Sequence, residues 1–263
     1  MTTPPAVVAR AVALGYRRDE VLTCSDFTAP VGGVTALVGP NGSGKSTILN
    51  AIAGLIRPLR GTIEVLGTSP EAARSRVAYV FQTVQANERL PLTVLEAVAM
   101  GRYSSLGLVR RLRGEDRAAI NHALDRMAIG DLRNRTLAEL SGGQRQRVLV
   151  AQGLAQDAQM LLLDEPVTGL DTQARDLIAA VLTEECAAGR TVVVSTHELD
   201  DAAAADHVLL LAGRVVASGS PPAVLTEEHL SLAYMGRIVR VGPTALLVDE
   251  ARTDPHDRHH HHP

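Results

Sequence analysis

Residues 39–46 read Gly-Pro-Asn-Gly-Ser-Gly-Lys-Ser and have the composition of a phosphate-binding loop. They match the pattern G-x-x-x-x-G-K-[ST] between an expected strand and an expected helix, which is the context that the pattern requires. Glycines let backbone N–H groups turn toward phosphate oxygens, and the helix N-terminus adds partial positive charge. Lys45 would reach the outer phosphates, and Ser46 would offer its hydroxyl to Mg²⁺. A glycine-rich turn without a ligand is the alternative interpretation.

Lys45 is also the only lysine among the 26 basic residues of this 263-residue chain. The planar fork of an arginine would not fit the same phosphate cradle, whereas an ammonium group is a compact point charge. The one exception to the arginine bias therefore falls where the chemistry of the motif requires a lysine.

Two acids, Asp164 and Glu165, follow the apolar run 161–163. Carboxylates at the end of a buried strand are costly unless they have a cation or a partner. Asp164 would hold the Mg²⁺ shell, and Glu165 would be the general base that polarises an attacking water. A strand that simply runs into a charged turn is the alternative, and the phosphate loop argues against it.

A histidine and a serine-glycine turn complete the candidate site. His197 follows a second apolar run at 191–195, and the ends of parallel strands meet at a ligand crevice, so we expect its imidazole beside the terminal phosphate. A structural histidine is the alternative.

Ser141-Gly142-Gly143-Gln144 at a helix start would form a second anion site, which two subunits packed head to tail would use on each other's ATP. An ordinary N-cap at Ser141 is the alternative.

The elements that position these residues alternate between strands and helices, which predicts an α/β fold with a parallel sheet covered on both faces. The helix that begins at Lys45 is expected to place Ile48, Ile52 and Leu55 on one face. Strands are expected at 34–38, 76–81, 160–163, 191–195 and 207–211, helices at 93–100, 116–128, 144–155 and 172–187, and hairpins at 208–217 and 238–248.

The domain organisation follows from the same pattern. Residues 6–67 are mostly strand-like, whereas the helices at about 90–155 interrupt the alternation and predict an inserted subdomain within one domain of 1–250. Residues 251–263 are polar, carry a run of histidines and are expected to be a disordered tail. Its imidazoles are candidate ligands for a metal such as zinc, while a purification-tag remnant and an idle tail are the alternatives.

Composition excludes several functional classes. The net charge of −3 and the scarcity of aromatics, with no Trp, argue against a nucleic-acid partner. The sequence has no run of about 18 apolar residues, so we expect no membrane span. The N-terminus lacks a signal pattern, so we expect a protein that is not secreted. Cys24 and Cys186 are isolated in apolar surroundings, which predicts reduced, packed thiols.

Six motifs together give the chain a resemblance to the nucleotide-binding subunit of ATP-binding cassette (ABC) transporters over about residues 5–235. The signature Leu-Ser-Gly-Gly-Gln-Arg-Gln-Arg at 140–147 is the most specific of them. The others are the phosphate loop 39–46, the loop glutamine Gln82, the segment Leu-Asp-Glu-Pro at 163–166, the turn Gly-Leu-Asp at 169–171 and the pair Thr-His at 196–197.

The resemblance implies a P-loop NTPase (RecA-like) core with a mainly parallel sheet, an N-terminal antiparallel β subdomain and an inserted α-helical subdomain. It implies catalytic roles for Glu165, His197, Gln82 and Lys45, and a Mg²⁺ ion held by Ser46, Gln82 and Asp164. The nucleotide would be bound by Tyr16, stacked on adenine, and by Gly39, Pro40, Asn41, Gly42, Ser43, Gly44, Lys45, Ser46 and Thr47. The signature residues Ser141, Gly142, Gly143 and Gln144 would act across a dimer, with Asp171 at the interface.

The resemblance also implies an ATPase that powers a membrane importer. The partners would be a second copy of the chain, separate permease subunits coupled through Gln82, and indirectly an extracytoplasmic solute-binding protein. The chain would lie peripherally on the cytoplasmic face of the inner membrane. Short strings at 91–94, 100–103 and 106–111 look most like zinc and manganese uptake systems. A siderophore or haem importer, a soluble ABC ATPase without a transport role and a regulatory module without turnover are the alternatives.

Overall fold

The computed structural model describes residues 4–17, 19–81, 92–106, 112–235, 238–241 and 245–248. A six-stranded sheet forms its centre, and all neighbouring strands in it are parallel except the last pair. In spatial order the strands are β5 (Val77–Val80), β6 (Met160–Asp164), β7 (Thr191–Thr196), β3 (Val34–Val38), β8 (His207–Leu211) and β9 (Val215–Gly219). The predicted mainly parallel α/β core is confirmed, because apolar runs that are buried on both faces form parallel strands.

A second, antiparallel sheet consists of β2 (Asp19–Ala29), β1 (Val7–Tyr16) and β4 (Arg60–Val65). Helix α1 (Lys45–Ile52) shares one apolar cluster with residues of both sheets, through the buried side chains Ile48, Leu49 and Ile52. The prediction that Leu55 continues this apolar face is wrong. The helix ends at Ile52, Gly54 follows with φ 68°, and Leu55 is 53% exposed.

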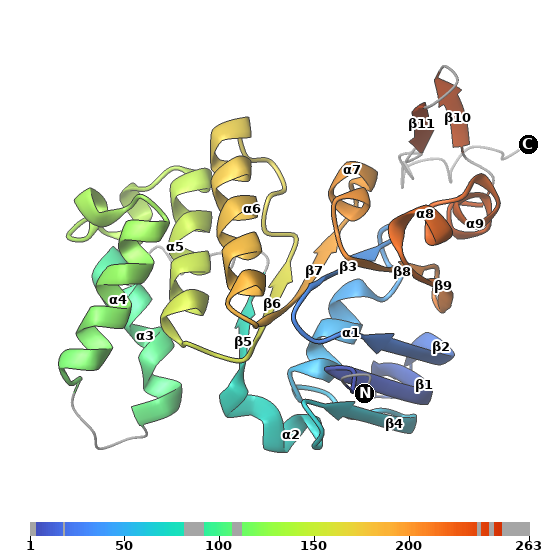
Figure 1. Ribbon diagram of the computed structural model, residues 1–263, viewed down its shortest axis with the longest axis horizontal. Helices are drawn as coiled ribbons and strands as arrows, with labels where there is room; N and C mark the ends of the chain where they lie inside the picture. The colour runs from blue at the N-terminus through green and yellow to red at the C-terminus, as the bar shows by residue number, and fades with distance from the viewer. Residues whose placement is uncertain are drawn as a thin grey trace, which may run out of the picture.

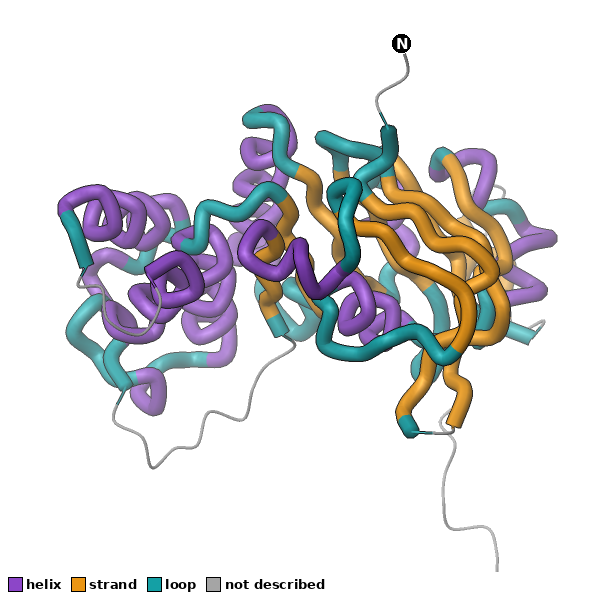
Figure 2. Tube along the Cα trace, turned by 90° about the horizontal axis from the view of Figure 1, so that it is seen from below, coloured by secondary structure: helices purple, strands orange, loops and turns teal. Residues whose placement is uncertain are grey.

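Three longer helices lie between β5 and β6 in the sequence. They are α3 (Val94–Leu106), α4 (Gly114–Arg126) and α5 (Gly142–Ala155), with 3-10 turns η2 (Gly130–Leu132) and η3 (Leu137–Glu139) before α5. Figures 1 and 2 show these helices gathered at one end of the molecule, away from the antiparallel strands. Their apolar side chains form one cluster with helix α6 (Thr172–Ala187) and one face of the central sheet.

The other end of the central sheet is covered by short helices. They are α7 (Leu199–Ala203), α8 (Pro221–Val224) and α9 (Glu227–Ala233), which share a cluster with β3 and β8. The remaining elements are α2 (Pro70–Ala73), η1 (Arg74–Arg76) and the antiparallel pair β10 (Ile238–Val241) and β11 (Ala245–Val248). Among the described helices, none is long and apolar enough to cross a lipid bilayer. The histidine-rich tail lies outside the described residues, and the single domain of 1–250 stays a prediction.

The two cysteines differ in a way that the sequence did not predict. Cys186 is half-buried at the end of α6, but Cys24 is exposed, so the prediction of a packed thiol is wrong for Cys24. The cause is a bulge: Leu22 pairs with Leu14 and Ser25 with Val12, so two residues of β2 lie opposite one residue of β1. Consecutive residues, rather than alternate ones, then face solvent.

Candidate nucleotide-binding and hydrolytic site

Three neighbouring strands of the central sheet end at the same edge and bring the candidate residues together. In the parallel register, Ser195 of β7 lies opposite Asp164 of β6 and opposite Leu37 of β3. The phosphate loop therefore leaves β3 beside the acids that end β6 and beside the residues that follow β7. This edge is the usual ligand crevice of an open α/β sheet.

The phosphate loop is closed around the ammonium group of Lys45. This side chain is buried, and its Nζ donates hydrogen bonds to the carbonyl oxygens of Gly39 at 2.7 Å and Pro40 at 3.2 Å. Gly44, with φ 103°, is the residue before α1, and a side chain there would be strained. A Cβ at Gly39 would lie 2.2 Å from the carbonyl oxygen of Leu211, so only glycine fits.

The loop also holds a buried polar atom that suits an anion. The hydroxyl oxygen of Ser43 is buried and has no hydrogen-bond partner within the described residues. Buried hydroxyls are normally satisfied, so this donor fits a phosphate oxygen in the loop. A cavity of about 440 Å³ opens here, and Ser46, with an exposed side chain, lies on its wall. Its lining is Val21, Asn41, Gly42, Ser43, Gly44, Lys45, Ser46, Thr47, Glu165, Thr168 and His197.

The two acids after β6 are held differently. Asp164 is buried, and its carboxylate accepts hydrogen bonds from the hydroxyls of Ser195 at 2.5 Å and Tyr79 at 3.5 Å. Glu165 turns out of the strand with φ 47°, a left-handed conformation that costs a non-glycine residue about 1–2 kcal/mol. Its carboxylate faces the cavity, where it accepts a hydrogen bond from Thr168 at 3.3 Å. Asp164 is thus held in the interior by hydrogen bonds, whereas the Glu165 carboxylate faces the cavity.

His197 lines the same cavity, next to Glu165. Its Nδ1 is 3.8 Å from a carboxylate oxygen of Glu165, so the imidazole and the second acid are neighbours. The chain after His197 is anchored by a bidentate ion pair, in which Arg175 of α6 donates two hydrogen bonds of 2.7 Å to Glu198. Thr196 adds a hydrogen bond of 3.1 Å to Asp201. These anchors hold the backbone on both sides of the histidine.

Sequence reasoning missed the supporting residues Ser195, Tyr79 and Thr168. Tyr79 lies on β5, and burial among apolar neighbours raises the pKa of its phenol strongly, with Asp164 as a further cause. The phenol therefore stays protonated and can donate to that carboxylate. A sequence signal existed for Ser195 alone, as a small hydroxyl in a run of valines, but its partners lie far away in the chain.

The signature residues lie in a separate cavity of about 520 Å³. It is lined by Ser141, Gly143 and Gln144 together with Asp171, and none of these residues lines the cavity of the phosphate loop. Ser141 is the N-cap of α5: its hydroxyl accepts from the Gln144 amide at 3.2 Å, and the Gln144 side chain accepts from the Ser141 amide at 3.0 Å. The capping role that was the alternative interpretation is therefore present.

Two other predicted residues lie at the edge of the site or beyond it. Tyr16, at the end of β1, is 45% exposed and is not among the residues that line the cavity. Its phenol oxygen accepts a hydrogen bond of 2.8 Å from Asn50 on α1, the helix that follows the phosphate loop. Gln82 lies outside the described residues.

Comparisons with known proteins agree with this geometry. A family model described as ABC transporter matches residues 22–168. The chain is 38% identical to the "Zinc transport system ATP-binding protein TroB" of Treponema pallidum, over 98% of this chain and 96% of that protein. It is 37% identical to the "Manganese transport system ATP-binding protein MntA" of Synechocystis, over 80% and 82% of the two chains.

A solved structure described as an inward-facing conformation of a putative metal-chelate type ABC transporter superposes with a TM-score of 0.78. The two sequences are 27% identical, and the match covers 93% of this chain and 96% of that chain. The family match and the relatives together include the phosphate loop, the acids after β6 and the signature turn. The chain belongs to the ABC transporter family and is one of its ATP-binding, ATP-hydrolysing subunits.

Proposed function

We propose that this chain hydrolyses ATP to drive the import of a divalent metal ion, zinc or manganese. The relatives described above support the metal, since their names specify zinc and manganese transport. One observation of the site carries the hydrolytic part of the proposal. Lys45, Glu165 and His197 line a single cavity and come from the segments that follow three neighbouring strands, β3, β6 and β7.

Each of these residues has a distinct task in the proposed reaction. The Lys45 ammonium exchanges its loop carbonyls for the outer phosphates, where its charge offsets theirs. Glu165 is the general base, because its carboxylate faces the cavity and can accept the proton of an attacking water. His197, which lies next to Glu165 in the cavity, contacts the terminal phosphate. The backbone amides of residues 39–47 bind the remaining phosphate oxygens at the start of α1.

Ser46 lines the cavity and Asp164 is buried directly before Glu165, which lines it, so oxygen donors of the kind that Mg²⁺ prefers lie at this site. The hydroxyl of Ser46 and the carboxylate of Asp164 are the proposed ligands, together with Gln82. When bound, the ion neutralises charge on the β- and γ-phosphates. The chain's contribution is to orient the Asp164 carboxylate through hydrogen bonds from the Ser195 and Tyr79 hydroxyls.

We further propose that the chain works as a head-to-tail homodimer. The supporting observation is that the signature turn and the phosphate loop line different cavities. Ser141 and Gly143 do not line the cavity of their own phosphate loop. Packing of two copies would place Ser141–Gln144 of each against the nucleotide of the other, with Asp171 at the contact. Tyr16, exposed beside α1, is the proposed stacking partner of adenine.

The proposed direct partner in the membrane is a separate permease, and an extracytoplasmic solute-binding protein is an indirect partner. This chain would lie peripherally on the cytoplasmic face of the inner membrane. On the side of the inserted helices, α3 exposes Met100 (45%) and Tyr103 (54%), which suits contact with another protein. Gln82, between β5 and α3 in the sequence, is the proposed coupling residue.

Uptake of radioactive zinc, manganese and iron by cells lacking the chain tests the proposal. We expect loss of zinc or manganese uptake and its restoration by the wild-type gene. Unchanged uptake of both metals would contradict the metal assignment, and loss of iron-siderophore or haem uptake alone would favour that alternative. Recovery of the chain with ribosomes and not with membranes would favour the soluble ABC alternative.

A further inference from the structure

Ser195 is a buried hydroxyl in an otherwise apolar strand, and it contacts both acids of the site. It lies in β7 directly after three valines and is fully buried. A buried hydroxyl is costly unless its hydrogen bonds are made. Its two bonds join it to two consecutive residues of the neighbouring strand end.

The first bond holds the carboxylate of Asp164. The Ser195 Oγ donates to Asp164 Oδ1 at 2.5 Å, while Tyr79 donates to the other carboxylate oxygen at 3.5 Å. A serine hydroxyl has one proton, so this donation uses it fully and leaves the oxygen free to accept. Ser195 therefore can bond to a second group through its oxygen while it makes the shorter of the two hydroxyl contacts to Asp164.

The second bond holds the backbone of Glu165. Its amide donates to the same Ser195 Oγ at 2.9 Å, at the point where φ 47° takes the chain out of the β6 ladder. The parallel pairing of β6 and β7 ends with Asp164 and Ser195, so the side-chain oxygen takes the place of the next ladder acceptor. The strained conformation that presents Glu165 to the cavity persists only where its surroundings hold it.

We propose that Ser195 is a positioning residue for ATP hydrolysis, in which one hydroxyl sets the Asp164 carboxylate and the Glu165 backbone relative to each other. This inference rests on the proposed function of the two acids. Ser195 does not line the nucleotide cavity, so it acts only through them. Its removal should impair turnover and the use of Mg²⁺ without weakening Mg²⁺-free nucleotide binding at the phosphate loop.

The test compares Ser195→Ala, Ser195→Cys and Ser195→Thr in the purified full-length chain. Cysteine fills the site but is a weak donor and acceptor, whereas threonine keeps the hydroxyl. Steady-state ATPase rates give kcat and KM. Binding of a fluorescent ATP analogue, with EDTA and then with Mg²⁺, separates the loop from the metal site. Thr35→Val is the matched control, because Thr35 is a fully buried residue of neighbouring β3 whose hydroxyl has no partner within the described residues.

We expect kcat to fall about tenfold or more in the alanine and cysteine variants, as for loss of a hydrogen bond to a charged group. Their Mg²⁺-free affinity for the analogue should stay within about twofold of wild type, and Mg²⁺ should enhance binding less than in wild type. The threonine and control variants should keep near-normal rates.

Normal kcat in both the alanine and cysteine variants would overturn the proposal. So would a parallel loss of kcat and Mg²⁺-free binding, which indicates a purely structural role, and so would equal losses in the threonine and cysteine variants. If the alanine variant does not fold, the cysteine and threonine pair decides. A wild-type chain that does not hydrolyse ATP would instead contradict the proposed function.

Discussion

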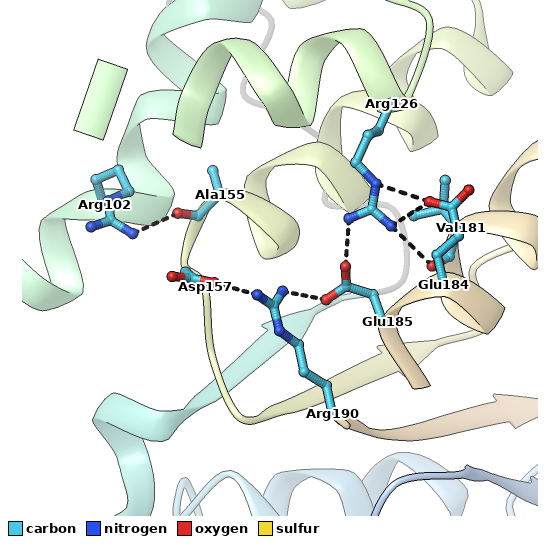
Figure 3. Close-up of polar contacts among 8 residues, drawn as sticks. All are labelled: Arg102, Arg126, Ala155, Asp157, Val181, Glu184, Glu185 and Arg190. Carbon is cyan, nitrogen blue, oxygen red and sulfur yellow. Dashed lines mark hydrogen bonds and ion pairs between the residues drawn. The ribbon is translucent and has the colours of Figure 1, made fainter. Parts of the chain in front are cut away.

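A buried carboxylate, Glu185 of α6, connects the inserted helices to the central sheet. Figure 3 shows it between two guanidinium groups: Arg126 at the end of α4 and Arg190 just before β7 both donate to it. The Glu185 side chain is only 5% exposed, and that of Arg126 is 15% exposed. We therefore choose Glu185→Gln, which removes the charge with almost no change in volume.

The expected loss of stability follows from the hydrogen bonds. The amide of glutamine has one oxygen acceptor, so one charged hydrogen bond, worth about 1.5–3 kcal/mol, is lost and the other becomes weaker by about 1 kcal/mol. Arg126 would still form its ion pair with Glu184, and Arg190 its ion pair with Asp157. These remaining pairs limit the cost of burying a cation without a partner. We expect the free energy of unfolding to fall by about 2.5–4 kcal/mol, or the melting temperature by about 5–15 °C.

Urea unfolding followed by circular dichroism measures this change, and Glu184→Gln is the control. Glu184 bonds to the same Arg126, but its side chain is 65% exposed, so its loss should cost less than about 1 kcal/mol. If the two variants lose the same stability, the argument from burial is refuted.

Three further predictions concern single side chains. Iodoacetamide at about pH 8 should alkylate Cys24 well before Cys186, because burial raises the pKa of the Cys186 thiol to about 11; equal rates in peptide mapping would count against the exposure of Cys24. Asp171→Ala should lower the stability of the chain by about 1 kcal/mol in thermal unfolding, since the carboxylate accepts the Ala174 amide at 2.8 Å as the N-cap of α6; Asp171→Asn should restore most of it, and an alanine variant as stable as wild type would refute the cap. An amine-directed label should react at Lys45 and the N-terminus only, and ATP should protect Lys45 in mass spectra; labelling of Lys45 that ATP leaves unchanged would contradict the phosphate cradle.

Local spacing was enough to predict the phosphate loop and the acids after β6, because each is a run of adjacent residues tied to one strand end. The helix 172–187 was likewise predicted with its observed bounds. Contacts between distant segments were not accessible in this way. Ser195 meets Asp164 only because β6 and β7 pair in a particular register, and nothing in either segment alone specifies that register.

The wrong predictions have local physical causes. Periodicity extended the face of α1 to Leu55, but a glycine in the left-handed conformation ended the helix first. Apolar neighbours suggested a packed Cys24, but a bulge in β2 broke the alternation there. Both errors arise where one backbone irregularity overrides a regular side-chain pattern.

Glu165 is the proposed general base of the ATPase, and the variant Glu165→Gln is the sharpest test of that role. The change preserves shape and the hydrogen bond from Thr168 while removing the basic carboxylate. We predict that binding of Mg²⁺-ATP stays within about threefold of wild type while the rate of phosphate release falls by about 10²–10⁴-fold. A glutamine variant that releases phosphate at nearly the wild-type rate would show that Glu165 is not the general base.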